Sequence, residues 1–262
     1  MTGVINEIPL TLTWQMFAIV CPLVFLAGFV DSIGGGGGLI SLPAYILAGL
    51  PSHLAIGTNK LSSACGTCVS VFRFIREKLV NWRLGVVTIA AAIAGSFVGA
   101  RVSLYTDENI LKYVMIPVLC IAAFFVLNRR LFGNADKESD EITGRTYVIA
   151  VIASLVIGFY DGFYGPGTGT FLIICLNVFG HLSVKKANAQ SKIINLTTNL
   201  TSLTVFILGG QVMWAIGLAG AVCNMLGNYL GSKLAITKGA KITRPIIITV
   251  LVILAVKILF ID

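Results

Sequence analysis

The stretch GFVDSIGGGGGLISLPAYI, residues 28–46, places an aspartate, Asp31, and five consecutive glycines, residues 34–38, inside a strongly apolar segment. Each glycine costs roughly 1 kcal/mol relative to alanine in a helix interior, so a run of them predicts a break in the helix. Within a membrane, such a break is tolerated only where the freed backbone lines a cavity. The stretch therefore predicts a broken membrane helix at a binding site.

The composition predicts an integral membrane protein. Of the 262 residues, 56% are hydrophobic and only 11% are charged, whereas soluble domains carry about 25% charged residues. The longest polar stretch is residues 128–146, which leaves no room for a separate soluble domain. Apolar runs of membrane-spanning length predict an all-α, multi-pass membrane protein, and they lie at residues 14–30, 84–100, 110–127, 147–160 and 245–261.

The formal net charge of +8 has a topological explanation. The basic residues cluster in short connections between apolar runs, as lysine and arginine do in cytoplasmic loops. We therefore expect a lipid bilayer rather than nucleic acid as the partner. No lysine or arginine precedes Lys60, so the first apolar run is expected to be a retained helix rather than a signal peptide.

The chain contains an internal repeat. GFVDSIGGGGG at residues 28–38 recurs as GFYDGFYGPGT at residues 158–168, an offset of 130, and later matches such as Lys60 with Lys192 keep an offset of 132. We predict a first membrane repeat at residues 1–128, a cytoplasmic linker at 129–146 and a second, homologous repeat at 147–262.

The loop charges predict that the two repeats are inverted. The connection 73–83 carries four basic residues and one glutamate, whereas its counterpart at 209–211 has no charge. The next connection reverses this pattern, because 101–112 mixes both signs and 233–244 holds four basic residues and no acid. Under the positive-inside rule this arrangement is typical of inverted-repeat transporters.

Inversion requires an odd number of crossings in each repeat. Residues 39–50 make this number odd if they cross the membrane and even if they fold back as a re-entrant piece. Because this segment is short for a crossing, we predict a total of eight to ten transmembrane segments, with glycine-broken helices. Gly-xxx-Gly pairs at 95/99 and 227/231 predict close helix packing. Whether these pairs pack within one chain or between two chains of a homo-oligomer stays open at this point.

Four ionisable residues lie in apolar segments at matching repeat positions: Asp31 with Asp161, and Lys60 with Lys192. Each costs at least ~2.5–3.5 kcal/mol on insertion scales, and such residues are functional candidates by default. The alternative for the aspartates is helix capping, and for the lysines it is snorkelling to the interface. Their recurrence in both repeats favours function.

The surroundings of these charges suit a small oxyanion. Each lysine lies among amide and hydroxyl side chains, and the glycine breaks expose backbone N–H groups, which bind anions at helix starts. We therefore predict a substrate site formed by Asp31, Gly35, Gly36, Gly37, Thr58, Asn59, Lys60, Ser62, Asp161, Gly165, Gly167, Thr168, Gln190, Lys192 and Asn195.

No cofactor or metal is expected. Cys65 and Cys68 have CxxC spacing, but no second CxxC or histidine cluster completes a zinc site. The glycine run lacks the GxxxxGK[ST] spacing of a nucleotide-binding loop.

The two glycine-rich regions, GFVDSIGGGGGLISLPAYILAGLPSHLAIGTNKLSS and GFYDGFYGPGTGTFLI with the later NAQSKIINLTTNLTSL, resemble the signature regions of the sulfite exporter TauE/SafE family. The resemblance extends from about residue 14 to residue 260 and includes the tandem arrangement. It implies a bacterial-type, multi-pass protein of the cell inner membrane that transports small sulfur-containing anions, with sulfite and organosulfonates such as sulfoacetate as substrates. The residues that match by position are the glycine motifs and Asp31, Asn59, Lys60, Asp161, Gln190 and Lys192.

The leading hypothesis is a secondary transporter that exports such an anion, bound near the bilayer midplane between the broken helices. The aspartates would pair with the lysines, for which we first consider Asp31 with Lys60, or carry protons as the coupling ion. One alternative is a channel or permease for another small anion. A more remote one is an intramembrane enzyme, because Tyr160-Asp161 is similar to the YD of intramembrane aspartyl proteases, although their GxGD motif is absent here.

Overall fold

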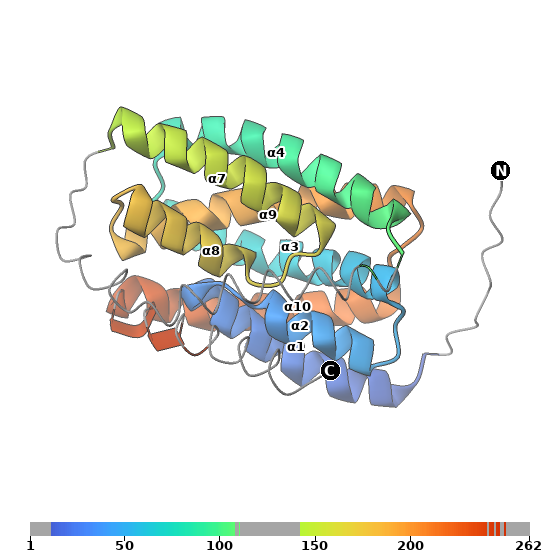
Figure 1. Cartoon of the computed structure of the whole chain (residues 1–262). Coiled ribbons are helices and arrows are strands. Elements are labelled where there is room, and N and C mark those ends of the chain that lie inside the picture. The colour runs from blue at the N-terminus through green and yellow to red at the C-terminus, as the bar shows by residue number, and fades with distance from the viewer. Residues whose placement is uncertain are drawn as a thin grey trace.

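The described part of the protein is a bundle of helices (Figure 1). The computed structural model describes residues 12–107, 110, 142–239, 241–243, 245, 246 and 249, and these contain no β-strand. Most of the predicted linker 129–146 and most of the apolar runs 110–127 and 245–261 lie outside the described residues.

The same order of helices occurs twice. A long helix, a short helix and two further long helices form the first series: α1 (Trp14–Gly34), α2 (Gly38–Leu47), α3 (Ser52–Arg76) and α4 (Trp82–Tyr105). The second series is α7 (Gly144–Phe163), α8 (Thr168–Ile174) with the π-helical turn η1 (Cys175–Phe179), α9 (Val184–Leu208) and α10 (Trp214–Lys238).

The long helices have the dimensions of membrane spans. Within the described residues, α1, α4 and α7 are long and apolar enough to cross a bilayer. Helices α3, α9 and α10 are more polar but have 25 residues each, a length of about 37 Å against a hydrocarbon thickness of ~30 Å. Helix α2, with 10 residues, is only about 15 Å long, so it does not cross by itself.

Glycines break the helix in both series. After α1 ends, Gly35 and Gly36 have φ values of 74° and 80°, and after α7 ends, Gly165 and Gly167 have φ values of 99° and 87°. Residues with a Cβ rarely adopt this left-handed region, so glycine is required at these turns. The predicted breaks are therefore present.

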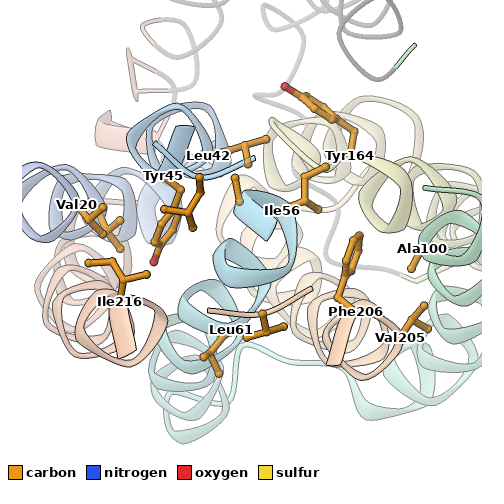
Figure 2. Close-up of a cluster of buried hydrophobic side chains, with 14 of the residues drawn as sticks. Val20, Leu42, Tyr45, Ile56, Leu61, Ala100, Tyr164, Val205, Phe206 and Ile216 are labelled. Carbon is orange, nitrogen blue, oxygen red and sulfur yellow. The ribbon is translucent and has the colours of Figure 1, made fainter. Parts of the chain in front are cut away.

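The two series exchange their outer helices. Helix α1 packs along α10 of the other series, and α7 packs along α4, while α3 and α9 lie against each other in the centre (Figure 1). One cluster of buried apolar side chains packs α2 with α3 and α9, through Tyr45 of α2, Ile56 of α3 and Phe206 of α9 among others (Figure 2). In a second cluster Leu172 of α8 packs with Ile194 of α9. Each short helix is thus held against a central helix.

The Gly-xxx-Gly pairs form the outer contacts. A Cβ on Gly95 or Gly99 of α4 would overlap backbone atoms of α7, and a Cβ on Gly227 or Gly231 of α10 would overlap backbone atoms of α1. The predicted close packing is confirmed, and these contacts lie within one chain.

Candidate functional site

The two glycine breaks meet at the centre of the bundle. A Cβ on Gly35 would overlap the backbone of Gly169 and Thr170. The Thr170 hydroxyl donates a hydrogen bond to the Gly34 carbonyl at 2.9 Å, and the Asn188 amide donates to the Ile33 carbonyl at 2.9 Å. The carbonyls left over at the end of α1 are thereby satisfied by the second half of the chain.

Two buried ion pairs flank this crossing. Lys192 Nζ of α9 lies 2.6 Å from Asp31 Oδ2 of α1, and Lys60 Nζ of α3 lies 3.0 Å from Asp161 Oδ1 of α7. The lysine side chains are 0% and 2% exposed, and the aspartates 15% and 3%. The lysines therefore do not snorkel to an interface.

Each pair joins one half of the chain to the other. The pairing of Asp31 with Lys60 considered from the sequence is wrong. Each aspartate lies near the end of the first long helix of its own half and faces the central helix of the other half. Asp31 therefore pairs with Lys192 of α9, and Asp161 pairs with Lys60 of α3.

The aspartates also bind the breaks themselves. Asp31 Oδ1 accepts a hydrogen bond from the Gly37 N–H at 3.2 Å, and Asp161 Oδ1 accepts one from the Thr168 hydroxyl at 2.8 Å. Asp161 Oδ2 is buried and has no hydrogen-bond partner among the described residues. Local capping and ion pairing therefore occur together, and Asp161 retains one unused acceptor.

A small polar cavity lies between the breaks and the central helices. Its volume is about 20 Å³, enough for a single water molecule, which needs roughly 10–15 Å³, and too small for an oxyanion such as sulfite. The cavity is lined by Asp31, Gly36, Gly37, Gly38, Asn59, Lys60, Ser63, Thr67, Asp161, Gly165, Gly167, Thr168, Gly169, Asn195, Asn199 and Asn224.

Ten of the residues predicted for the site line this cavity, and five do not: Gly35, Thr58, Ser62, Gln190 and Lys192. Lys192 does not line the cavity itself, but it forms an ion pair with Asp31, which does. Thr58 Oγ1 accepts a hydrogen bond from the Met213 N–H at 3.0 Å, and the Ser62 hydroxyl donates to the Asn59 carbonyl at 3.0 Å. Gln190 faces Thr88 of α4 instead.

Several lining residues were missed by the site prediction. Thr67 follows Lys60 by seven positions and Asn199 follows Lys192 by seven, a spacing that returns to the same helix face. That spacing could have identified both. Asn224 of α10 has no such signal, because the position 132 residues earlier is Ala92.

No metal centre is formed by the described residues, which contain no group of three His, Cys, Asp or Glu side chains able to hold an ion. Cys65 and Cys68 are both free thiols.

Comparison with known protein families identifies the family of this chain. The family described as Sulfite exporter TauE/SafE matches residues 20–258. The chain belongs to this family. The aspartates of this TauE/SafE member are each neutralised by a lysine rather than paired with one another, unlike the carboxylate dyad of an aspartyl protease. Family membership supports the expectation that the chain is a membrane transporter and not an enzyme.

Curated relatives carry names of the same kind. The chain is 38% identical over 241 residues to the probable membrane transporter protein YfcA of Escherichia coli K12, covering 91% of this chain and 87% of the relative. It is 34% identical over 250 residues to a probable membrane transporter protein of Haemophilus influenzae, covering 94% and 95%. A more distant relative is the probable membrane transporter protein YdhB of Bacillus subtilis, 25% identical and covering 80% and 85%. No solved structure matches this chain.

Proposed function

We propose that the protein is a secondary transporter that exports a small sulfur-containing anion, sulfite or an organosulfonate, across the inner membrane. The observation that carries this proposal is the pair of buried lysine–aspartate contacts beside a cavity lined with amides, hydroxyls and glycine backbone. Two buried ammonium groups offset the desolvation of an anion, and backbone N–H groups supply directional donors. The family description supports sulfite as the first substrate to test.

The ion pairs suggest how protons couple to transport. An anion that binds Lys60 has to replace Asp161 as the partner of the ammonium group. Protonation of Asp161 releases the lysine and removes the repulsion between the carboxylate and the anion. We therefore propose that the two aspartates carry protons in exchange for, or together with, the substrate.

The arrangement of helices supports an alternating-access mechanism between two inverted repeats, residues 1–128 and 147–262, joined by a cytoplasmic linker. Helix α1 and its counterpart α7 run in opposite directions in Figure 1. Helices α3 and α10 end, and α9 begins, at one common end of the bundle (Figure 1). Arg76, Lys78, Lys186 and Lys238 lie on these termini, which by the positive-inside rule would face the cytoplasm of a multi-pass inner-membrane protein.

Flux of radiolabelled sulfite into proteoliposomes tests the proposal. We expect saturable uptake by the wild type and loss of uptake in Lys60→Met and in Lys192→Met, each checked for folding by size-exclusion chromatography. The double variants Lys60→Met/Asp161→Leu and Lys192→Met/Asp31→Leu, in which no buried carboxylate is stranded, provide folded controls that should also be inactive. Uptake that survives in these double variants would contradict the proposed site.

The same vesicles separate the alternatives. If another small anion is transported and sulfite is not, the proposed substrate falls while the site stands. A single-channel current in planar bilayers would replace the transporter by a channel.

A further inference from the structure

Two pairs of asparagines lie at the small polar cavity between the glycine breaks, which we call the central cavity. In each pair the second asparagine follows the first by four positions, so both side chains lie on one face of the helix. The pairs are Asn195 with Asn199 on α9 and Asn224 with Asn228 on α10. All four residues are buried, and the first three line the cavity whereas Asn228 does not.

Hydrogen bonds within the α10 pair determine which atom of Asn224 is left for the cavity. The Nδ2 group of Asn228 donates to the backbone carbonyl of Asn224 at 3.1 Å and to Asn224 Oδ1 at 2.6 Å. A backbone carbonyl can only accept, so the amide atom of Asn228 beside it has to be the NH₂ group, and the atom of Asn224 that takes the second bond has to be the oxygen. Asn228 Oδ1 in turn accepts a hydrogen bond from the Ser70 hydroxyl of α3 at 2.6 Å. The NH₂ group of Asn224 is therefore the part of its amide that remains for the cavity.

The α9 pair has the same arrangement. Asn199 Nδ2 donates to the backbone carbonyl of Asn195 at 2.8 Å and also to Asn195 Oδ1. Asn195 Nδ2 is directed toward the second glycine break, because a Cβ added to Gly169 would lie 3.6 Å from it. Within the described part of the chain, neither Asn195 nor Asn224 donates a hydrogen bond through its NH₂ group. Each pair thus turns one unused NH₂ group toward the cavity.

Two glycines make room for the α10 pair. A Cβ on Gly66 of α3 would lie 1.8 Å from Asn224 Oδ1, and a Cβ on Gly28 of α1 would lie 2.5 Å from the Asn224 backbone oxygen and 2.9 Å from Asn228 Nδ2. Real Cβ atoms do not approach other atoms this closely, so the asparagines fit only because both neighbouring helices lack a side chain at these points.

The oriented amides come from the second half of the chain. The positions 132 residues before Asn195 and Asn224 are Ser63 and Ala92. Ser63 also lines the cavity, but its hydroxyl donates to Asn59 Oδ1 at 3.5 Å, and alanine has no polar group to offer. The two asparagine pairs therefore do not follow from the repeat.

We propose that the NH₂ groups of Asn195 and Asn224 donate hydrogen bonds to an oxyanion bound in the central cavity, and that Asn228 is a positioning residue that holds the Asn224 amide in its donating orientation. This role rests on the proposed function, because it takes the central cavity as the anion site. An amide with the opposite orientation would present Oδ1 and repel the anion, so the fixed orientation selects an acceptor-rich, negatively charged ligand over a cation.

Equilibrium binding of radiolabelled sulfite to the purified full-length protein tests the proposal. The test variants are Asn195→Ala and Asn224→Ala, and the leucine variants at the same positions leave no space for a water molecule to replace the amide. The controls are Ser202→Ala of α9 and Ser232→Ala of α10, which each remove a buried hydroxyl from the same helix without lining the cavity. Every variant is first checked for folding by size-exclusion chromatography.

We expect each asparagine variant to bind sulfite at least about tenfold more weakly than the wild type, because a hydrogen bond to a charged group is lost. The serine controls should bind as the wild type does. Wild-type affinity in the alanine and leucine variants, or no sulfite binding by the wild type, would overturn the proposal.

A double-mutant cycle tests the role of Asn228. Asn228→Ala should weaken sulfite binding in the wild-type background and have little further effect in Asn224→Ala, because it acts through that amide. A merely structural role would weaken binding equally in both backgrounds, and that result would overturn the positioning role.

Uptake of sulfite into proteoliposomes separates the role of the amides from the proposed function. If the wild type binds sulfite through the two asparagines but does not transport it, the proposed function is wrong and the role of the amides stands. If binding and uptake require Lys60 but neither Asn195 nor Asn224, the role of the amides is wrong and the proposed function stands.

Discussion

Removing one partner of the Lys60–Asp161 pair should strongly destabilise the protein. The two charged atoms are 3.0 Å apart and the side chains are 2% and 3% exposed. At an effective dielectric constant of ~20, unit charges at this distance attract by roughly 5 kcal/mol, and a stranded partner costs about 3–5 kcal/mol. We therefore expect Lys60→Met to lower the free energy of unfolding by about 3–5 kcal/mol.

A double-mutant cycle shows whether the pairing is crossed. In Lys60→Met/Asp161→Leu the carboxylate is removed as well. The decrease in the free energy of unfolding should therefore be smaller, by about 2–3 kcal/mol, than the sum of the decreases in the two single variants. In Lys60→Met/Asp31→Leu each substitution strands a different partner, and the losses should nearly add. Equilibrium unfolding in mixed SDS–detergent micelles, followed by tryptophan fluorescence, measures both. A larger coupling of Lys60 to Asp31 than to Asp161 would refute the arrangement described here.

Two further predictions concern packing and hydrogen bonding. A Cβ on Gly99 or Gly231 would overlap backbone atoms of the neighbouring helix, so Gly99→Ala and Gly231→Ala should each lower the midpoint of thermal unfolding by several degrees. Gly144→Ala is the control, because its added Cβ meets open space and should leave the midpoint unchanged. Equal midpoints in all three variants would argue against the predicted helix contacts. Thr58→Val should cost about 1–3 kcal/mol, because the Met213 N–H loses its acceptor, and the same unfolding assay should show a smaller loss for Thr58→Ser, which keeps the hydroxyl.

The sequence is sufficient to predict which residues and helix breaks form this site, but not which of them contact one another. The glycine breaks, the membrane helices and the intramembrane charges all follow from local costs: helix propensity, apolar length and the desolvation of Asp31, Lys60, Asp161 and Lys192. The Gly-xxx-Gly pairs likewise predict close packing, because only small side chains let backbones approach. Each of these inferences depends on residues that are near one another in the chain.

The partner of each group depends on the tertiary arrangement instead. Asp31 precedes Lys60 by 29 positions and Lys192 by 161, and neither spacing indicates which ammonium group it meets. The answer comes from the exchange of outer helices, in which the most extensive packing of α1 is against α10 of the other series. For the same reason Asn224, which α10 contributes from the far end of the chain, could not be assigned to the cavity.

The crossed pairs also constrain how the site can open. The central cavity holds about one water, so an oxyanion is admitted only if the elements around it separate. Each ion pair joins the two halves, so separating the halves breaks both pairs. Breaking a buried pair so that a charge stays buried and unpaired costs about 3–5 kcal/mol. Under the proposed function, an anion bound to the lysine and a proton bound to the aspartate would offset this cost. The proposal therefore predicts that the two ion pairs oppose separation of the halves while the site is empty, and that leakage through an unoccupied site is unfavourable.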